Sequence, residues 1–184
     1  MLYLVTGGSG SGKSEYAEKL AVLNHQKEQG SLYYIATMVP YDEECQERIR
    51  RHRVMRKDKG FQTLECFCHL GQIYVKKNDV VLLECMSNLL ANEMYQADGS
   101  IKKRGKEADI QLMASILEPV LQLKRQAGCL VVVTNEVFSD GVLYEEETKE
   151  YIRLLGKANA FLANHAEAVT EVVCSIPVYL KASV

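Results

Sequence analysis

The sequence predicts an α/β fold in which a mostly parallel central sheet is flanked by helices. Short apolar runs alternate along the chain with longer segments of helical periodicity, and each run is apolar at successive positions rather than at every second one. Strands of a parallel sheet are covered on both faces and give such continuous apolar runs. The repeated strand-then-helix order is typical of α/β folds with right-handed crossovers.

The individual elements follow from these runs and from the segments between them. We expect strands at 2–6 (LYLVT), 32–36 (LYYIA), 79–83 (DVVLL), 129–134 (CLVVVT) and 169–174 (VTEVVC). We expect helices at 12–28, 42–57, 85–96, 107–126 and 145–165. Pro177 precedes the apolar residues 178–180, which we expect to form an antiparallel C-terminal edge strand, where proline is best tolerated. The polar segment 97–106 contains two glycines and is expected to be a mobile loop.

Composition limits the class of protein. A chain of 184 residues with 47% apolar residues predicts one domain, 1–184, with a real core. The net charge of −2 gives no overall electrostatic reason to expect nucleic acid or an anionic membrane as a partner. The first strand runs directly into a glycine-rich loop without a secretory leader, so we expect a cytoplasmic protein whose six cysteines are reduced. No apolar stretch reaches the roughly 18 residues of a spanning helix, so we expect no membrane insertion.

The segment GGSGSGKS at 7–14 predicts a phosphate-binding P-loop. It matches G-x-x-x-x-G-K-[ST] and lies between a predicted strand and a predicted helix, which is the context that the motif requires. The backbone N–H groups of such a loop and the positive end of the following helix favour phosphate. We expect the nucleotide to be bound by Gly7, Gly8, Ser9, Gly10, Ser11, Gly12, Lys13 and Ser14. The alternative is a glycine-rich turn that only joins strand to helix.

Two side chains are candidates for binding Mg²⁺. The Ser14 hydroxyl is the usual metal ligand of this loop, and Glu84 follows the apolar run 80–83. An acidic residue at the carboxyl end of a core strand lies where ligands gather in open α/β sheets. Phosphoryl transfer needs charge neutralisation, which a magnesium ion on these residues provides. The alternative is that Glu84 simply ends the strand.

His52 is a candidate nucleophile. The segment 42–56 reads as one helix with acidic residues in its first turn and basic residues in its last turn, and His52 shares a face with Arg48 and Arg56. An unprotonated imidazole nitrogen between guanidinium groups suits attack on a phosphate. From the spacing alone, a solvated basic helix face with an incidental histidine is the favoured interpretation. RNA binding is less favoured because no aromatic residues interleave with the basic ones.

Several short motifs occur along the chain in a fixed order. They are GGSGSGKS, YIAT at 34–37, RIRRH at 48–52, TLEC at 63–66, LLEC at 82–85 and TNEV at 134–137. In this order the chain resembles, over almost its whole length, the cobinamide kinase/cobinamide-phosphate guanylyltransferase family of cobalamin biosynthesis.

The resemblance implies a bifunctional enzyme with a RecA-like P-loop NTPase fold. Such an enzyme phosphorylates the aminopropanol hydroxyl of adenosylcobinamide with ATP or GTP, then transfers GMP from GTP to adenosylcobinamide phosphate through a covalent histidine–GMP intermediate. It implies that His52 is this nucleophile and that the protein is a homotrimer with active sites near subunit boundaries. From the loop motif itself, we expect Lys13 to reach the β- and γ-phosphates and so to act in catalysis. The residues expected to line the site are Thr37, Arg48, Thr134, Asn135 and Glu136.

The chain departs from the family pattern in two places. Family loops commonly carry an arginine where this chain has Gly10 or Ser11, and a glycine-rich stretch commonly follows TNEV where this chain reads FSDGVLY at 138–144. Two other functions stay open from the sequence. One is a P-loop kinase for a small metabolite without nucleotidyl transfer, and the other is a nucleotide-dependent switch or binding module.

Overall fold

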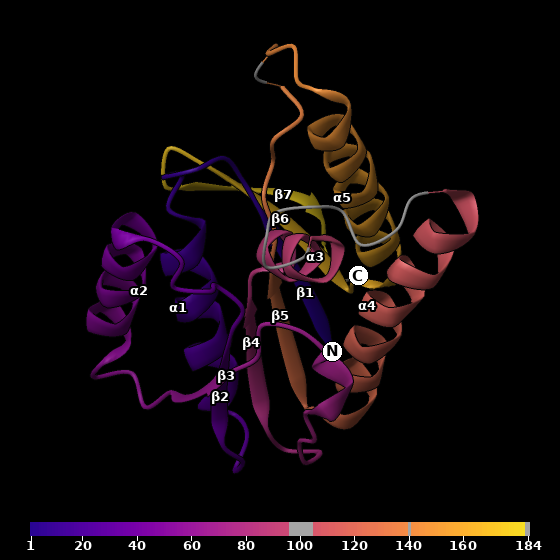
Figure 1. Cartoon of the computed structure of the whole chain (residues 1–184). Helices are drawn as coiled ribbons and strands as arrows, with labels where there is room; N and C mark the ends of the chain where they lie inside the picture. Colours follow the sequence, from indigo (N-terminus) through magenta and orange to yellow (C-terminus); the bar gives the residue numbers. More distant parts are fainter. Residues whose placement is uncertain (96–104, 140, 183–184) are drawn as a thin grey trace.

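A seven-stranded sheet forms the centre of the protein in the computed structural model, which describes residues 1–95, 105–139 and 141–182 (Figure 1). The strands are β1 (Leu2–Thr6), β2 (Leu32–Ala36), β3 (Gln62–Glu65), β4 (Val80–Glu84), β5 (Cys129–Val133), β6 (Ala168–Val173) and β7 (Ile176–Lys181). The helices are α1 (Lys13–His25), α2 (Glu43–Arg56), α3 (Met86–Met94), α4 (Lys106–Gln126) and α5 (Glu146–His165), with a 3₁₀ turn η1 (Leu70–Gln72).

The strand order confirms the expected fold class. The order is β3-β2-β4-β5-β1-β6-β7, and every neighbouring pair is parallel except β6 and β7, which pair antiparallel at the C-terminal edge. β5 therefore separates β1, which carries the phosphate loop, from β4, which ends in Glu84. A mostly parallel sheet with an antiparallel pair at its C-terminal edge agrees with the predicted α/β architecture.

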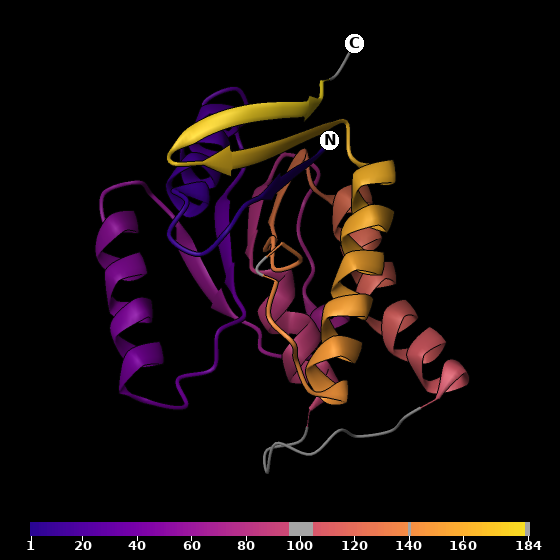
Figure 2. The ribbon, with the colours of Figure 1, turned by 90° about the horizontal axis from the view of Figure 1, so that it is seen from above.

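Helices cover both faces of the sheet. α1 and, outside it, α2 lie on one side, whereas α3, α4 and α5 lie on the other, as the two views in Figures 1 and 2 show. All five residues of β4 and all five of β5 are buried, because these central strands are covered on both faces. The core holds the carboxyl ends of β1, β4 and β5 in fixed register, and these ends carry the candidate site.

The structure adds one strand that the sequence pattern did not indicate. β3 is short, and three of its four residues are exposed, so it lacks the apolar run that marks the other strands. Residues 97–104 of the loop expected at 97–106 lie outside the described residues. No helix in the described part of the chain combines the length and the apolar character that crossing a membrane requires.

Candidate active site

The phosphate loop connects β1 to α1 at the carboxyl edge of the sheet. Gly12, directly before α1, has φ +90°, and a Cβ there would lie 2.7 Å from Oγ of Ser175. Both the backbone conformation and the space therefore favour glycine at this position. The backbone N–H of Ser175 donates to the carbonyl of Ser11 at 2.8 Å. The turn between β6 and β7 thus stabilises the phosphate loop through this hydrogen bond.

The two polar residues at the end of the loop make different contacts, Lys13 within the loop and Ser14 with β4. Lys13 Nζ donates to the carbonyl of Gly8 at 2.9 Å, and burial lowers the pKa of this lysine. The Ser14 hydroxyl donates to Oε1 of Glu84, whose side chain is 8% exposed. The structure therefore brings together the two residues expected to bind magnesium, although they are 70 positions apart in the sequence.

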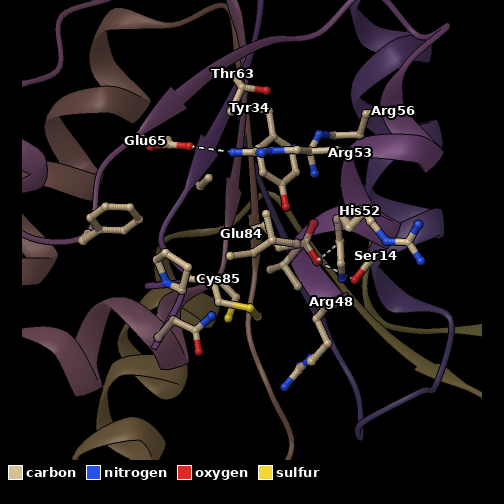
Figure 3. A pocket seen from close by; sticks show the side chains of 18 of the residues that line it. Ser14, Tyr34, Arg48, His52, Arg53, Arg56, Thr63, Glu65, Glu84 and Cys85 are labelled. Atoms are coloured by element: carbon tan, nitrogen blue, oxygen red, sulfur yellow. Dashed lines mark hydrogen bonds and ion pairs between the residues drawn. The ribbon is translucent and has the colours of Figure 1, made fainter. Parts of the chain in front are cut away.

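His52 meets the same carboxylate. Its Nδ1 lies 3.6 Å from Oε1 of Glu84, so one oxygen atom contacts both the phosphate-loop serine and the histidine of α2 (Figure 3). Burial lowers the pKa of His52; the Glu84 carboxylate opposes this shift, and Arg56 and Arg48 add to it. A lowered pKa favours the neutral imidazole, which keeps one nitrogen lone pair for nucleophilic attack.

α2 is held mainly by contacts near its C-terminal end. Arg56 is the buried residue of this helix, and its guanidinium lies 3.5 Å from the ring centroid of Tyr34. Just beyond the helix, Lys59 Nζ pairs with Oε2 of Glu18 on α1 at 2.6 Å. Cation–π stacking and a partly buried ion pair therefore fix the helix that presents His52.

Sequence reasoning missed these anchoring residues. Glu18 is completely buried, because it lies on the covered face of α1 together with Ala17 and Ala21. A carboxylate on that face is the signal that was available, because a buried acid requires a partner. Its partner Lys59 could not be identified, because it lies 41 positions away.

A cavity of about 470 Å³ opens between the phosphate loop, α2 and β3. This volume lies in the range of small-molecule sites. Lys13 and Ser14 line it from the loop, and Arg48 and His52 line it from α2. The unexpected strand β3 supplies further polar groups, including Glu65, which Arg53 of α2 contacts at 2.8 Å (Figure 3).

The other residues expected to line the site divide into two groups. Asn135 lines the cavity and donates from Nδ2 to Ser87 Oγ at 2.7 Å. Thr37 and Thr134 are fully buried and bond to the framework around the cavity, Thr37 to the backbone of Cys85 and Thr134 to the side chain of Asn159. The backbone N–H of Glu136 donates to the carbonyl of Gly7 at 3.1 Å and so supports the loop.

Comparison with known proteins gives a family match over nearly the whole chain. The family model described as cobinamide kinase / cobinamide phosphate guanyltransferase matches residues 3–180. The chain is 34% identical over 190 residues to the bifunctional adenosylcobalamin biosynthesis protein CobU of Escherichia coli (strain K12), an alignment that covers 98% of this chain and 100% of that protein.

Two further relatives have similar names. The bifunctional adenosylcobalamin biosynthesis protein CobU of Salmonella typhimurium (strain LT2) is 31% identical, with 98% of this chain and 100% of that protein covered. The bifunctional adenosylcobalamin biosynthesis protein CobP of Pseudomonas aeruginosa (strain PAO1) is 28% identical, with 97% and 96% covered.

Proposed function

The chain belongs to the cobinamide kinase / cobinamide phosphate guanyltransferase family, and from this premise we propose that it catalyses both reactions at one site. It phosphorylates the aminopropanol hydroxyl of adenosylcobinamide with ATP or GTP, and then transfers GMP from GTP to the new phosphate through a covalent adduct on His52. One observation carries the proposal: Oε1 of Glu84 contacts both Ser14 of the phosphate loop and His52. A triphosphate held by the loop therefore lies beside the imidazole.

In the kinase reaction, the loop positions the transferred γ-phosphoryl group. Backbone N–H groups of Gly7, Gly8, Ser9, Gly10, Ser11 and Gly12 surround the phosphates. Lys13 moves from the Gly8 carbonyl to the β- and γ-oxygens and stabilises their charge. Ser14 and Glu84 offer adjacent hard oxygen ligands that fit Mg²⁺, which when bound neutralises charge on the phosphate oxygens.

In the guanylyl reaction, Nε2 of His52 is the attacking atom. Nδ1 faces the Glu84 carboxylate, which favours the tautomer that carries its proton on Nδ1 and leaves the lone pair on Nε2. Nε2 attacks the α-phosphorus, the bond to the β-phosphate oxygen breaks, and pyrophosphate leaves. A phosphate oxygen of adenosylcobinamide phosphate then displaces the imidazole and takes the GMP. Two displacements replace one difficult step.

The wider setting of the enzyme is also part of the proposal. We assign residues 1–184 to one P-loop nucleotide-binding domain in a cytoplasmic homotrimer, and neither nucleic acid nor a membrane is a partner. The single sheet, the net charge of −2 and the family resemblance support this assignment. The volume of the cavity beside β3 supports a nucleotide site there; Arg48 and Asn135 line it, while Thr37, Thr134 and Glu136 bond to the residues around it.

Radioactive labelling tests the function directly. Purified protein with Mg²⁺ and α-labelled GTP is expected to acquire label that is released when adenosylcobinamide phosphate is added. His52→Asn is expected to abolish labelling while phosphorylation of adenosylcobinamide by γ-labelled ATP continues. His69→Asn is the matched control, because this histidine is 72% exposed and pairs with Glu93 away from the cavity. Phosphorylation without any labelling of the wild type would instead indicate a kinase without nucleotidyl transfer.

A further inference from the structure

Three buried polar atoms converge beside the cavity without a hydrogen-bond partner. Among the described residues, five buried side-chain atoms have no hydrogen-bond partner, and three of them are Oε1 of Glu18, Oε2 of Glu84 and Nδ1 of His52; the other two are Oγ of Ser11 and Nη1 of Arg56. Glu18 is 0% exposed and Glu84 is 8% exposed. Leaving a charged or polar atom buried and unpaired is unfavourable, so three such atoms in one place indicate a missing binding partner.

The three side chains come from different elements and are arranged around one point. Glu18 lies on α1, His52 on α2 and Glu84 on β4. One carboxylate oxygen of Glu18, one of Glu84 and a ring nitrogen of His52 all lie within 4.8 Å of one another. Donors that share one transition-metal ion at about 2.0–2.2 Å lie roughly 3–4.4 Å apart. Small side-chain rotations are therefore enough to close the set around an ion.

In both Glu18 and Glu84, the second carboxylate oxygen already accepts a hydrogen bond. Oε2 of Glu18 accepts from Lys59, and Oε1 of Glu84 accepts from Ser14. These two contacts hold the carboxylate planes and leave one oxygen of each residue for another partner. Second contacts of this kind are how proteins orient metal ligands.

We propose that Glu18, His52 and Glu84 bind a first-row transition-metal dication of the Zn²⁺ or Mn²⁺ type, and that this ion keeps the histidine inactive. One imidazole nitrogen with two carboxylate oxygens suits such ions, whereas Mg²⁺ prefers oxygen ligands alone. The site therefore differs in chemistry from the oxygen pair of Ser14 and Glu84, and it competes with that pair for Glu84.

Inactivation follows from the proton count of the imidazole. A neutral imidazole has one nitrogen with a free lone pair and one nitrogen that carries the proton. When Nδ1 donates its lone pair to the metal, the proton resides on Nε2, and Nε2 has no lone pair with which to attack phosphorus. This inhibitory effect rests on the proposed function, whereas metal binding itself does not.

The charges around the site favour an exchangeable ion rather than a permanent one. Two carboxylates offset the charge of the dication, but Lys59 pairs with Glu18, and Arg56 lies close enough to affect the pKa of both Glu18 and His52. These cations weaken binding relative to a closed structural metal site. A nucleotide that arrives with Mg²⁺ and engages Glu84 is therefore expected to displace the ion.

Histidine NMR during a Zn²⁺ titration tests the binding site. The chain has four histidines, so the ring signals of ¹⁵N-labelled protein can be assigned with His52→Asn. We expect Zn²⁺ to shift Nδ1 of His52 to the position of a metal-bound nitrogen at one equivalent. Glu18→Gln, which keeps the side-chain shape and an acceptor for Lys59, is expected to weaken the Zn²⁺ affinity at least about tenfold. Glu15→Gln is the matched control, since this acid is exposed on the same helix and pairs with Lys19.

Labelling with α-labelled GTP in excess Mg²⁺ then tests the inhibition. Zn²⁺ is expected to slow adduct formation in the wild type and in Glu15→Gln, and Glu18→Gln is expected to need at least about ten times more Zn²⁺ for the same effect. Zn²⁺ shifts confined to other histidines, or equal Zn²⁺ affinity of wild type and Glu18→Gln, would overturn the site. Unchanged labelling with Zn²⁺ bound at His52 would overturn the inhibition. Absence of labelling without Zn²⁺ would instead reject the proposed function, because the NMR titration does not depend on it.

Discussion

The phosphate loop and helix α2 contribute to the same cavity but are held in place very differently. The loop joins β1 to α1 beside the central strands β4 and β5, in which every residue is buried. α2 has one buried residue, Arg56, and lies outside α1 at the side of the sheet (Figure 1). One half of the site is therefore part of the core, whereas the other half depends on a few polar contacts.

This difference separates the two proposed reactions. Phosphoryl transfer requires the loop and Glu84, which are part of the buried sheet. Guanylyl transfer requires in addition that α2 hold His52 beside Glu84. Changes in the loop are thus expected to affect both reactions, and changes in the anchors of α2 are expected to affect mainly the second.

The largest effect is expected from Lys13→Ala. This change removes the charged group that stabilises the transferring and leaving phosphates, so both kinase turnover and labelling by GTP should fall roughly 10²–10³-fold. Steady-state kinase assays and single-turnover labelling measure the two losses. Lys19→Ala is the control, because that lysine is exposed on the same helix and pairs with Glu15. An unaffected kinase rate in Lys13→Ala would remove the loop from the mechanism.

The next prediction compares how much the central sheet and helix α2 contribute to the free energy of unfolding. Leu82→Ala on β4 removes a completely buried side chain and is expected to lower the free energy of unfolding by about 2–5 kcal/mol. Met55→Ala on α2 removes a side chain that is 39% exposed, and the expected loss is below about 1 kcal/mol. Urea unfolding followed by circular dichroism measures both values. Equal losses would mean that α2 is as firmly packed as the sheet.

A smaller and more selective effect is expected from Arg56→Met. The substitution keeps much of the side-chain length but removes the guanidinium that stacks on Tyr34. Loss of about 1 kcal/mol of cation–π interaction energy should slow labelling of His52 several-fold to tenfold, while the rate of adenosylcobinamide phosphorylation stays the same. Arg51→Met, at an exposed position of the same helix, is the control. A parallel loss of both activities would show that the anchor supports the whole site.

The pH dependence of labelling gives the finest test of the environment of His52. The nucleophile is the neutral imidazole, so the labelling rate falls as pH decreases through its pKa. Because burial lowers this pKa, the acid limb is expected below the ordinary range of histidine. Arg56→Met reduces the positive charge near the ring and is expected to move the limb to higher pH. Labelling rates across a pH series measure the acid limb of the wild type and of Arg56→Met. A wild-type acid limb at or above the ordinary pKa of histidine would contradict the burial of the ring.

The same contrast explains how much the sequence could predict. The loop motif and the apolar runs are local patterns, so the sequence alone was sufficient to predict the parallel strands other than β3, the helices and the position of Glu84 at the end of β4. β3 was missed because an exposed edge strand has no apolar run. The contacts of Lys59 with Glu18 and of Arg56 with Tyr34 join residues far apart in the sequence, and no local sequence pattern predicts such pairs.

Mass spectrometry of the adduct tests the central claim most directly. Protein incubated with GTP and Mg²⁺ is digested under alkaline conditions, which preserve a phosphoramidate bond, and the modified peptide is fragmented. The account predicts one GMP attached to His52, absent from His52→Asn and lost after addition of adenosylcobinamide phosphate. A GMP group on any other residue, or an adduct that persists in His52→Asn, would contradict it.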